Sequence, residues 1–538
     1  MRILVFHGYL LGGTGSNVYN ARLAAALVAL GNEVHLLCQE RHPEAHAFVD
    51  AAGDWEGGRL SVRAMRDPVR CTVYRPDIGS LLPVYVADRY EGVEARTFAA
   101  CSDSELLAYV QANVEAVREV AARVKPQLAL ANHLVMGPAI LARALAGEVP
   151  YAVKVHGSAL EYTVKPQPER FLPFAREGLD RARAVLVGSR HTAESLWQAM
   201  ADPELPGRTR LGPPGVDVEL FSPREPARAA LGLRELAQRL RAAGTRARPG
   251  EDAFARDERA AGEQLARVEV ERDRLVAFVG KLIVSKGVEL PIAAWPLVIA
   301  QHPRARLLVV GFGAYRRALE ELLRALGAGE LARAKEIAVA GRALEDGSQP
   351  AAPLAQLLSF LHGLEGDERE RYVRAAAALH EAVIFTGRLD HDELAEVLPA
   401  CEAMVVPSTF PEAFGMVAAE AAACGALPVS AAHSGLAEVS AVLAAALPEQ
   451  AAWMLSFALD EGAVRALAAR VIAWLDAGAQ LRQRAREALV ATVREHWSWE
   501  GVARGVIAAA QGRLEGLHEP ASPAAGQGGE RRGARTFG

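Results

Sequence analysis

Two glutamates separated by seven residues, Glu412 and Glu420, are placed where they could bind one elongated ligand. The apolar run Ala403–Val406 before them is typical of a short buried strand, and the Ala-rich stretch after them ends at Gly425, as a helix does. A helix that begins just after a strand offers free main-chain N–H groups and its positive dipole end to an anion. Glu412 would lie in the loop at this end, and Glu420 about one and a half turns into the helix.

We expect the helix to begin near Phe414 or Gly415. The string Pro411-Glu412-Ala413-Phe414-Gly415, with Glu420 seven residues beyond Glu412, resembles the signature of family 4 glycosyltransferases. These are retaining enzymes of the GT-B fold that use a nucleotide diphosphate-sugar donor. The resemblance implies that Glu412 contacts the donor sugar and that Glu420 binds the ribose hydroxyls. It also implies sugar and phosphate contacts from three backbone amides: Phe414, Gly415 and Met416.

Two lysines follow a second expected strand, Leu275–Val279. The stretch that contains Lys281 and Lys286 resembles the family's Gly-Arg-Leu…Lys-Gly phosphate clamp. Lys281 stands in place of the usual arginine, so the positive charge is kept but the bidentate guanidinium is absent. Two cations near a helix start can stabilise the diphosphate charge as the sugar departs. This chemistry requires no metal ion, so we expect no metal site and no cofactor besides the donor substrate. Gly387 and Arg388 match the loop that packs against the nucleobase in this family.

The loop that contains Gly12 and Gly13 opens a helix after the first expected strand. A dinucleotide-binding loop is one interpretation, but Val18 stands in place of its third glycine and Glu40 is poorly placed for the ribose. A P-loop is excluded, because no Gly-Lys-Ser/Thr follows. The resemblance instead implies the family's Gly-Gly loop, beside the donor phosphate and the acceptor.

A histidine, His156, follows the expected strand Tyr151–Val155, at the end of the sheet where doubly wound folds bind ligands. A lone histidine is more often structural than functional. The resemblance implies that His156 contacts the donor sugar, and His133 matches a second recurrent histidine of the family with a weaker claim.

Composition limits the remaining function classes. The net charge is −5, which does not favour nucleic-acid binding. The five cysteines are scattered without a CxxC pair, which indicates reduced thiols and a cytoplasmic protein. No apolar run reaches the roughly 20 residues of a membrane span, so we expect no transmembrane segment and leave peripheral membrane contact open.

Strands and helices alternate along the first half of the chain and a second set of strands follows, which predicts an α/β protein with parallel sheets. The resemblance implies that these sheets form the GT-B fold, with two doubly wound, Rossmann-like domains that face each other across a cleft. Eleven strands are expected: Ile3–Phe6, Glu33–Cys38, Cys71–Arg75, Leu128–Asn132, Tyr151–Val155, Ala184–Gly188, Leu275–Val279, Leu307–Val310, Val383–Thr386, Ala403–Val406 and Leu427–Ser430.

The predicted domain order is a first domain at 1–205, a linker at 206–222 and a second domain at 223–495. The resemblance implies that the first is the acceptor side and that the second binds the nucleotide-sugar. The second domain carries helical insertions at about 224–272 and 316–380. The resemblance implies that a crossover helix, 496–517, then returns to the first domain. A disordered tail is expected from 518 to 538.

The function expected from this resemblance is transfer of a sugar, with retention, to a hydroxyl of a saccharide or lipid-linked acceptor. A GT-B nucleotide-sugar epimerase or phosphorylase and a non-catalytic sugar-nucleotide-binding protein are the alternatives. The sequence leaves open the base, the sugar, the acceptor, the linkage formed, the role of the insertions and the oligomeric state.

Overall fold

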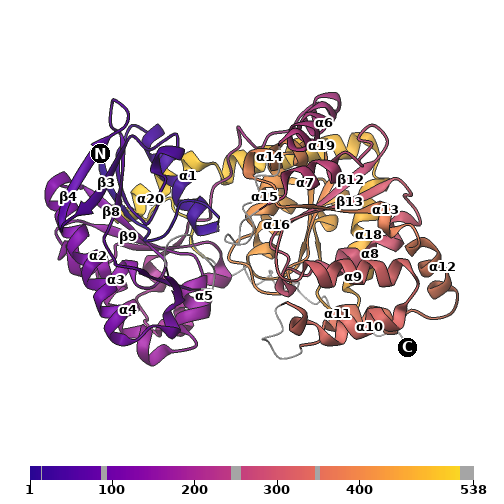
Figure 1. The fold of residues 1–538 in the computed structure, drawn as a ribbon, viewed down its shortest axis with the longest axis horizontal. Helices are drawn as coiled ribbons and strands as arrows, with labels where there is room; N and C mark the ends of the chain where they lie inside the picture. Colours follow the sequence, from indigo (N-terminus) through magenta and orange to yellow (C-terminus); the bar gives the residue numbers. More distant parts are fainter. Residues whose placement is uncertain (14, 86–93, 244–255, 346–351, 521–538) are drawn as a thin grey trace, which may run out of the picture.

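The computed structural model describes residues 1–13, 15–85, 94–243, 256–345 and 352–520, and these form two α/β domains side by side (Figure 1). The predicted fold class is confirmed, since each domain is built on a parallel sheet with helices on its faces. The only antiparallel pair described in either main sheet is β3 with β4, at one edge of the first.

The first sheet has the order β11-β10-β9-β8-β1-β2-β5-β3-β4. Its strands are β1 Arg2–Phe6, β2 Glu33–Leu37, β3 Ala51–Glu56, β4 Arg59–Ala64, β5 Cys71–Arg75, β8 Leu128–Asn132, β9 Tyr151–Val155, β10 Ala184–Val187 and β11 Thr209–Leu211. A separate pair is formed by β6 Leu81–Val84 and β7 Glu94–Thr97.

The second sheet has the order β14-β13-β12-β15-β16-β17. Its strands are β12 Arg274–Val279, β13 Ala305–Val310, β14 Val383–Gly387, β15 Ala403–Val406, β16 Leu427–Ala431 and β17 Ser456–Phe457. All eleven expected strands are present, within two residues at either end.

Helices cover both faces of each sheet. Those of the first domain are α1 Gly15–Ala29, α2 Asp103–Val124, α3 Gly137–Leu145, α4 Pro168–Asp180 and α5 Arg190–Met200. The second domain has α8 Glu289–Ile299, α14 His391–Val397, α15 Met416–Ala423, α16 Ser434–Ala446, α17 Glu449–Ala452, α18 Ala463–Asp476 and α19 Ala479–His496. Side chains along β1 alternate between two cores: Leu4 and Phe6 pack on the α2–α4 side, Ile3 and Val5 on the opposite side with α1. Burial on both faces explains why these strands are short apolar runs in the sequence.

Both stretches expected as insertions contain helices of the second domain. The first has α6 Pro226–Ala242 and α7 Glu258–Leu265, while residues 244–255 lie outside the described part. The second has α9 Arg316–Gly327, α10 Leu331–Ala340, α11 Ala355–His362, α12 Gly366–Ala376 and α13 Leu379–Ala382. Their apolar residues join the single large core of that domain, so the helices extend the domain.

The last helix, α20 Trp499–Ala510, leaves the second domain and packs on the first. It contacts α1, β8, β9 and β10, and buries Ala503 and Val506 in the core on the α1 side of the sheet. The chain therefore passes between the domains twice, and the two passages meet where Val216 pairs with Ser498.

Two parts of the chain differ from what the sequence led us to expect. Thr209–Leu211, inside the expected linker, pairs with β10 and is the edge strand β11 of the first sheet. His518, at the start of the expected tail, accepts a hydrogen bond from the main-chain N–H of Leu211 at 2.7 Å, so the ordered chain continues to this strand. The rest of the expected tail, from residue 521, lies outside the described residues. Among the helices described, none is long and apolar enough to cross a membrane.

Candidate active site

The loop between β15 and α15 carries Glu412, as the sequence predicts. The helix begins at Met416, with Gly415 as its N-cap residue, one or two residues later than expected. The main-chain N–H of Glu412 donates to Ser434 Oγ at 2.9 Å, and the Phe414 ring is buried edge-on against Trp497. These contacts hold the loop immediately before the free N–H groups of the helix.

Lys286 and Glu412 form an ion pair between Nζ and Oε1. Ser408 Oγ donates a second hydrogen bond to the same carboxylate oxygen at 2.6 Å. Burial alone would raise the pKa of the Glu412 carboxyl, but Lys286 and Ser408 outweigh it and lower the pKa below its usual value. Glu412 is therefore ionised near neutral pH, and a cation and an anion lie together at the N-terminal end of α15.

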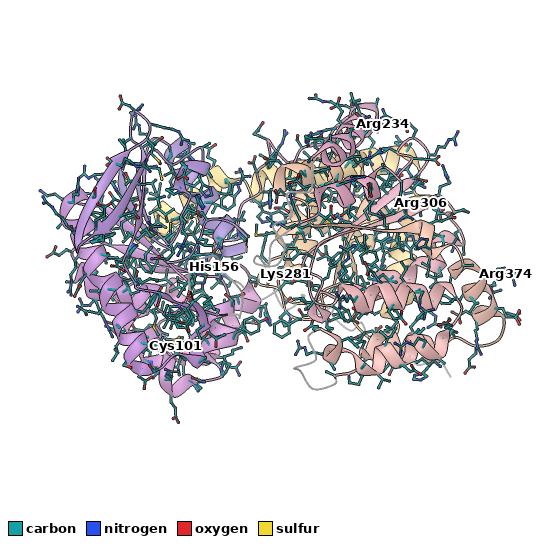
Figure 2. The ribbon with its side chains drawn as sticks, in the orientation of Figure 1. Cys101, His156, Arg234, Lys281, Arg306 and Arg374 are labelled. Atoms are coloured by element: carbon teal, nitrogen blue, oxygen red, sulfur yellow. The ribbon has the colours of Figure 1, made fainter. Side chains whose placement is uncertain are left out.

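The order of the strands brings these two residues together. β12 and β15 are neighbours in a parallel sheet, so the loops at their carboxyl ends lie side by side. Thr409 donates its main-chain N–H to the carbonyl of Ser285 at 2.9 Å, which joins the two loops. Gly287 has φ +65°, and a side chain there would collide with the carbonyl oxygen of Pro407. Glycine at this position thus permits the close approach that places Lys286 against Glu412. Lys281 lies in the same loop, next to β12, on the side of its domain that faces His156 (Figure 2).

Glu420 lies on the adjacent helix and is 4% exposed. His391, the first residue of α14, donates from Nε2 to Glu420 Oε1 at 3.0 Å. Burial lowers the pKa of His391, but the Glu420 carboxylate outweighs this and the pKa is raised above its usual value. Gly387 ends β14 just before this helix, and the guanidinium of Arg388 lies 5.9 Å from the centroid of the Phe312 ring.

The first domain contributes His156, in the loop after β9. Its Nε2 lies 2.9 Å from Asn132 Oδ1, and its ring is 4.9 Å from that of His133. Burial, followed by the positive potential of His133, Lys154 and His7, lowers the pKa of His156 well below its usual value. The imidazole is therefore neutral at physiological pH, and it can donate one hydrogen bond and accept another.

The glycine loop lies before α1 in the same domain. Gly12 and Gly13 are exposed, and Asn17 Nδ2 donates to the carbonyl of Gly12 at 2.6 Å. Glu40, which the sequence suggests is poorly placed for a ribose, accepts the main-chain N–H of Leu11 at 3.0 Å and so anchors this loop.

The two domains touch at the loop that carries Glu412. A Cβ at Gly188 would lie 2.7 Å from the carbonyl oxygen of Ala413, so only glycine allows this approach. Tyr162 and Phe410 stack across the boundary, with centroids 6.1 Å apart and an interplanar angle of 17°. His156 in the first domain and the Lys286–Glu412 pair in the second therefore belong to one interdomain region.

Four residues of this network were missed by the sequence interpretation: Ser408, Ser434, His391 and Asn132. Ser408 lies inside the motif that carries Glu412, and His391 follows Arg388 by three residues, so proximity to known motifs was the available signal. Asn132 could have been suspected because it ends a buried strand next to the one before His156.

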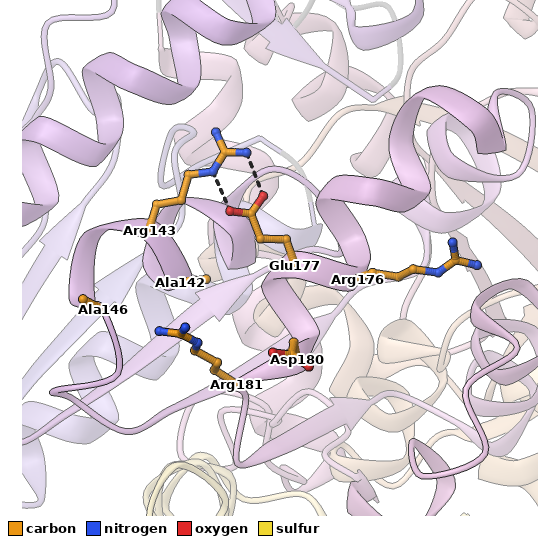
Figure 3. Close-up of a pocket in the computed structure, with 7 residues that line it drawn as sticks. All are labelled: Ala142, Arg143, Ala146, Arg176, Glu177, Asp180 and Arg181. Carbon is orange, nitrogen blue, oxygen red and sulfur yellow. Dashed lines mark hydrogen bonds and ion pairs between the residues drawn. The ribbon is translucent and has the colours of Figure 1, made fainter.

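A hollow of about 530 Å³ lies elsewhere in the first domain, between α3 and α4 (Figure 3). Arg143 forms a two-pronged ion pair with Glu177 there, at 2.7 Å for each hydrogen bond. None of the residues predicted for the site lines this hollow. In the described part of the chain, no group of three or more metal-ligating side chains is assembled.

Comparison with known proteins assigns a family to each domain. Residues 14–205 match the model described as glycosyl transferase 4-like domain, and residues 328–489 match glycosyl transferases group 1. D-inositol 3-phosphate glycosyltransferase from Segniliparus rotundus is 28% identical over 318 residues, which are 59% of this chain and 49% of that protein. The matched segments thus span at most about half the length of the curated relatives.

Solved structures share the fold over nearly the whole chain. Sucrose-phosphate synthase from Thermosynechococcus elongatus has a TM-score of 0.53 at 20% identity, covering 94% of this chain and 96% of its own. Anabaena HepE in complex with UDP-glucose has a TM-score of 0.53 at 16% identity, covering 94% and 98%. With a family match on each domain and this shared two-domain fold, the chain belongs to the family 4 glycosyltransferases of the GT-B fold.

Proposed function

We propose that this protein transfers a sugar from a nucleotide diphosphate-sugar to a hydroxyl of a saccharide or lipid-linked acceptor, with retention of anomeric configuration. The observation that carries the proposal is the Lys286–Glu412 ion pair at the N-terminal end of α15, where the two domains touch. HepE, which shares the fold, was crystallised with UDP-glucose, and this supports a nucleotide-sugar donor here.

In this proposal the diphosphate binds beside Lys281, Lys286 and the first N–H groups of α15. These positive groups stabilise the charge that develops as the bond between the anomeric carbon and the diphosphate oxygen breaks. The acceptor oxygen bonds to that carbon, and its proton passes to the departing diphosphate. Glu412, released from part of its pairing with Lys286, contacts the sugar.

The remaining residues hold the donor. Glu420 binds the ribose hydroxyls, and Gly387 with Arg388 packs against the base. The neutral imidazole of His156 contacts the sugar, while Gly12 and Gly13 approach the phosphate and the acceptor. The backbone amides of Phe414, Gly415 and Met416 complete the phosphate and sugar contacts. No metal ion takes part. We also propose a cytoplasmic location, because the five cysteines are buried free thiols.

The first test is a thermal-shift panel of UDP-, GDP- and ADP-sugars, because a ligand that binds the native state raises apparent stability. The stabilising donor is then assayed for release of nucleoside diphosphate with saccharide and lipid-linked acceptors. Lys286→Ala should lower kcat/KM by about two orders of magnitude, the scale of losing one preorganised charge.

Lys335 on α10 provides the matched control, and Lys335→Ala should leave turnover unchanged. Lys281→Arg restores the residue usual in the family and should remain active. Isomerisation of the donor without an acceptor would identify an epimerase instead. Donor binding without hydrolysis or transfer to any acceptor would identify a non-catalytic binding protein.

A further inference from the structure

The buried carboxylate of Glu420 is held by a residue of a different helix. Glu420 is on α15, while His391 is the first residue of α14, and Nε2 of His391 donates to Glu420 Oε1 at 3.0 Å. The Glu420 side chain is 5% exposed, whereas 37% of the His391 side chain remains exposed. The imidazole thus connects an enclosed carboxylate with the surface of the site.

A carboxylate that grips two ribose hydroxyls must present its oxygens in a fixed plane. A free glutamate side chain rotates about its last bond, and a buried one without a partner loses solvation. The hydrogen bond from His391 removes both problems, because it satisfies Oε1 and fixes the carboxylate plane. We propose that His391 is a positioning residue that holds Glu420 in the orientation in which it binds the nucleotide ribose; this rests on the proposed function.

His391 is itself fixed from two sides. The ring of Phe221 lies edge-on to the imidazole, with centroids 5.3 Å apart and an interplanar angle of 82°. Asp390 caps the N-terminus of α14 in a capping box with Glu393. Both of these acids pair with the guanidinium of Arg256.

Arg256 comes from the stretch predicted as the first insertion, just before α7. Because it pairs with Asp390, the residue before His391, and with Glu393 on the first turn of α14, it braces the start of this helix. Part of that insertion therefore supports the start of the helix that carries His391.

The test compares a ribonucleotide with its deoxy analogue. Calorimetry first identifies which of UDP, GDP and ADP binds the native protein, and the matching 2′,3′-dideoxynucleoside diphosphate is then titrated. His391→Phe keeps an aromatic ring beside Phe221 but removes the donor. This variant should bind the ribonucleotide about tenfold more weakly, the scale of one hydrogen bond to a charged group. Its affinity for the dideoxy analogue should be unchanged.

His391→Gln supplies an amide donor and should restore most of the lost affinity. In a Glu420→Ala background, His391→Phe should cause no further loss, since the two residues act through one interaction. His362, exposed at the end of α11, provides the control, and His362→Phe should bind as the native protein does.

Three outcomes would contradict the assignment. Equal weakening of both nucleotides by His391→Phe would indicate a general structural role, and unchanged binding of both would indicate no role. A loss in His391→Gln as large as in His391→Phe would exclude the hydrogen bond as the cause. If the native protein binds none of the three nucleotides, the proposed function itself is wrong and this assignment falls with it.

Discussion

Glu438 of the second domain caps the helix of the first domain that begins at Arg190. Its two carboxylate oxygens accept the main-chain N–H groups of Arg190 at 2.7 Å and of His191 at 3.0 Å. Free N–H groups and the positive end of the helix dipole both favour an anion at this position. One side chain therefore joins α16 to α5 and holds the two domains together where Gly188 meets Ala413.

Glu438→Ala should shift the protein toward a more open arrangement of its domains. Loss of hydrogen bonds to a charged group costs roughly 1.5–3 kcal/mol, which is about tenfold or more in the equilibrium between joined and separated domains. Small-angle X-ray scattering should show a larger radius of gyration than for the native protein. The exposed Glu449→Ala serves as the control, and an unchanged scattering curve for Glu438→Ala would contradict the capping role.

The two glutamates of the motif should respond differently to removal. Glu420→Ala should weaken the binding of the nucleotide diphosphate-sugar and of the bare nucleoside diphosphate by a similar factor, because the ribose is common to both ligands. Glu412→Ala should spare the bare nucleotide and damage turnover, because its contact exists only when a sugar is bound. Calorimetric titration of both variants with the nucleotide alone separates the roles. The reverse pattern would mean that α15 lies differently with respect to the donor.

Turnover should survive treatment with EDTA. The proposed chemistry uses Lys281, Lys286 and the N-terminus of α15 as the positive groups beside the diphosphate. The measurement is initial rate before and after chelation and dialysis. Loss of activity that is restored by magnesium or manganese would overturn the metal-independent mechanism.

Lys154 should make stability depend on pH in the alkaline range. It is buried on β9, its Nζ donates to the carbonyl of Gly212 at 2.6 Å, and burial lowers its pKa from 10.5 to about 7. The unfolded chain therefore holds more protons between about pH 7 and 10.5, so this lysine makes the free energy of unfolding rise with pH there. Below pH 7 the buried charge destabilises the fold in full.

Lys154→Met removes this dependence and should gain stability relative to the native protein at pH 6 to 7. The gain should shrink as the pH rises toward 10, because protonation of this lysine then favours the unfolded chain less and less. Urea unfolding at pH 6, 8 and 9.5 measures the difference. The exposed Lys125→Met is the control, and a difference that does not change with pH would contradict a depressed pKa.

Parallel strands buried on both faces could be predicted closely from the sequence. Leu128–Asn132 and Ala403–Val406 are short apolar runs with turn residues after them, and both are found with the expected bounds. The hairpin of β3 and β4 was missed because neither strand is a continuous apolar run: β3 ends with Asp54 and Glu56, and the edge strand β4 alternates polar and apolar residues. The Gly57-Gly58 turn between them was the available signal.

The candidate site was predictable where a motif spans neighbouring residues, and less so where distant elements meet. Lys286 and Glu412 were each singled out, but their ion pair follows from the adjacency of β12 and β15, which sequence order does not give. His391 and Glu420 lie on two helices that follow different strands of the sheet, so no local periodicity in the sequence connects them. Their meeting depends on tertiary packing.

The position of α20 has a consequence for synthesis of the chain. This helix completes the face of the first sheet that α1 also covers, yet it follows the entire second domain in sequence. As the chain leaves the ribosome, the apolar residues of β8 and β10 on that face remain uncovered until the last segment emerges. The domain that is synthesised first is therefore completed last. A nascent chain halted after α19 exposes an apolar surface that is prone to aggregation.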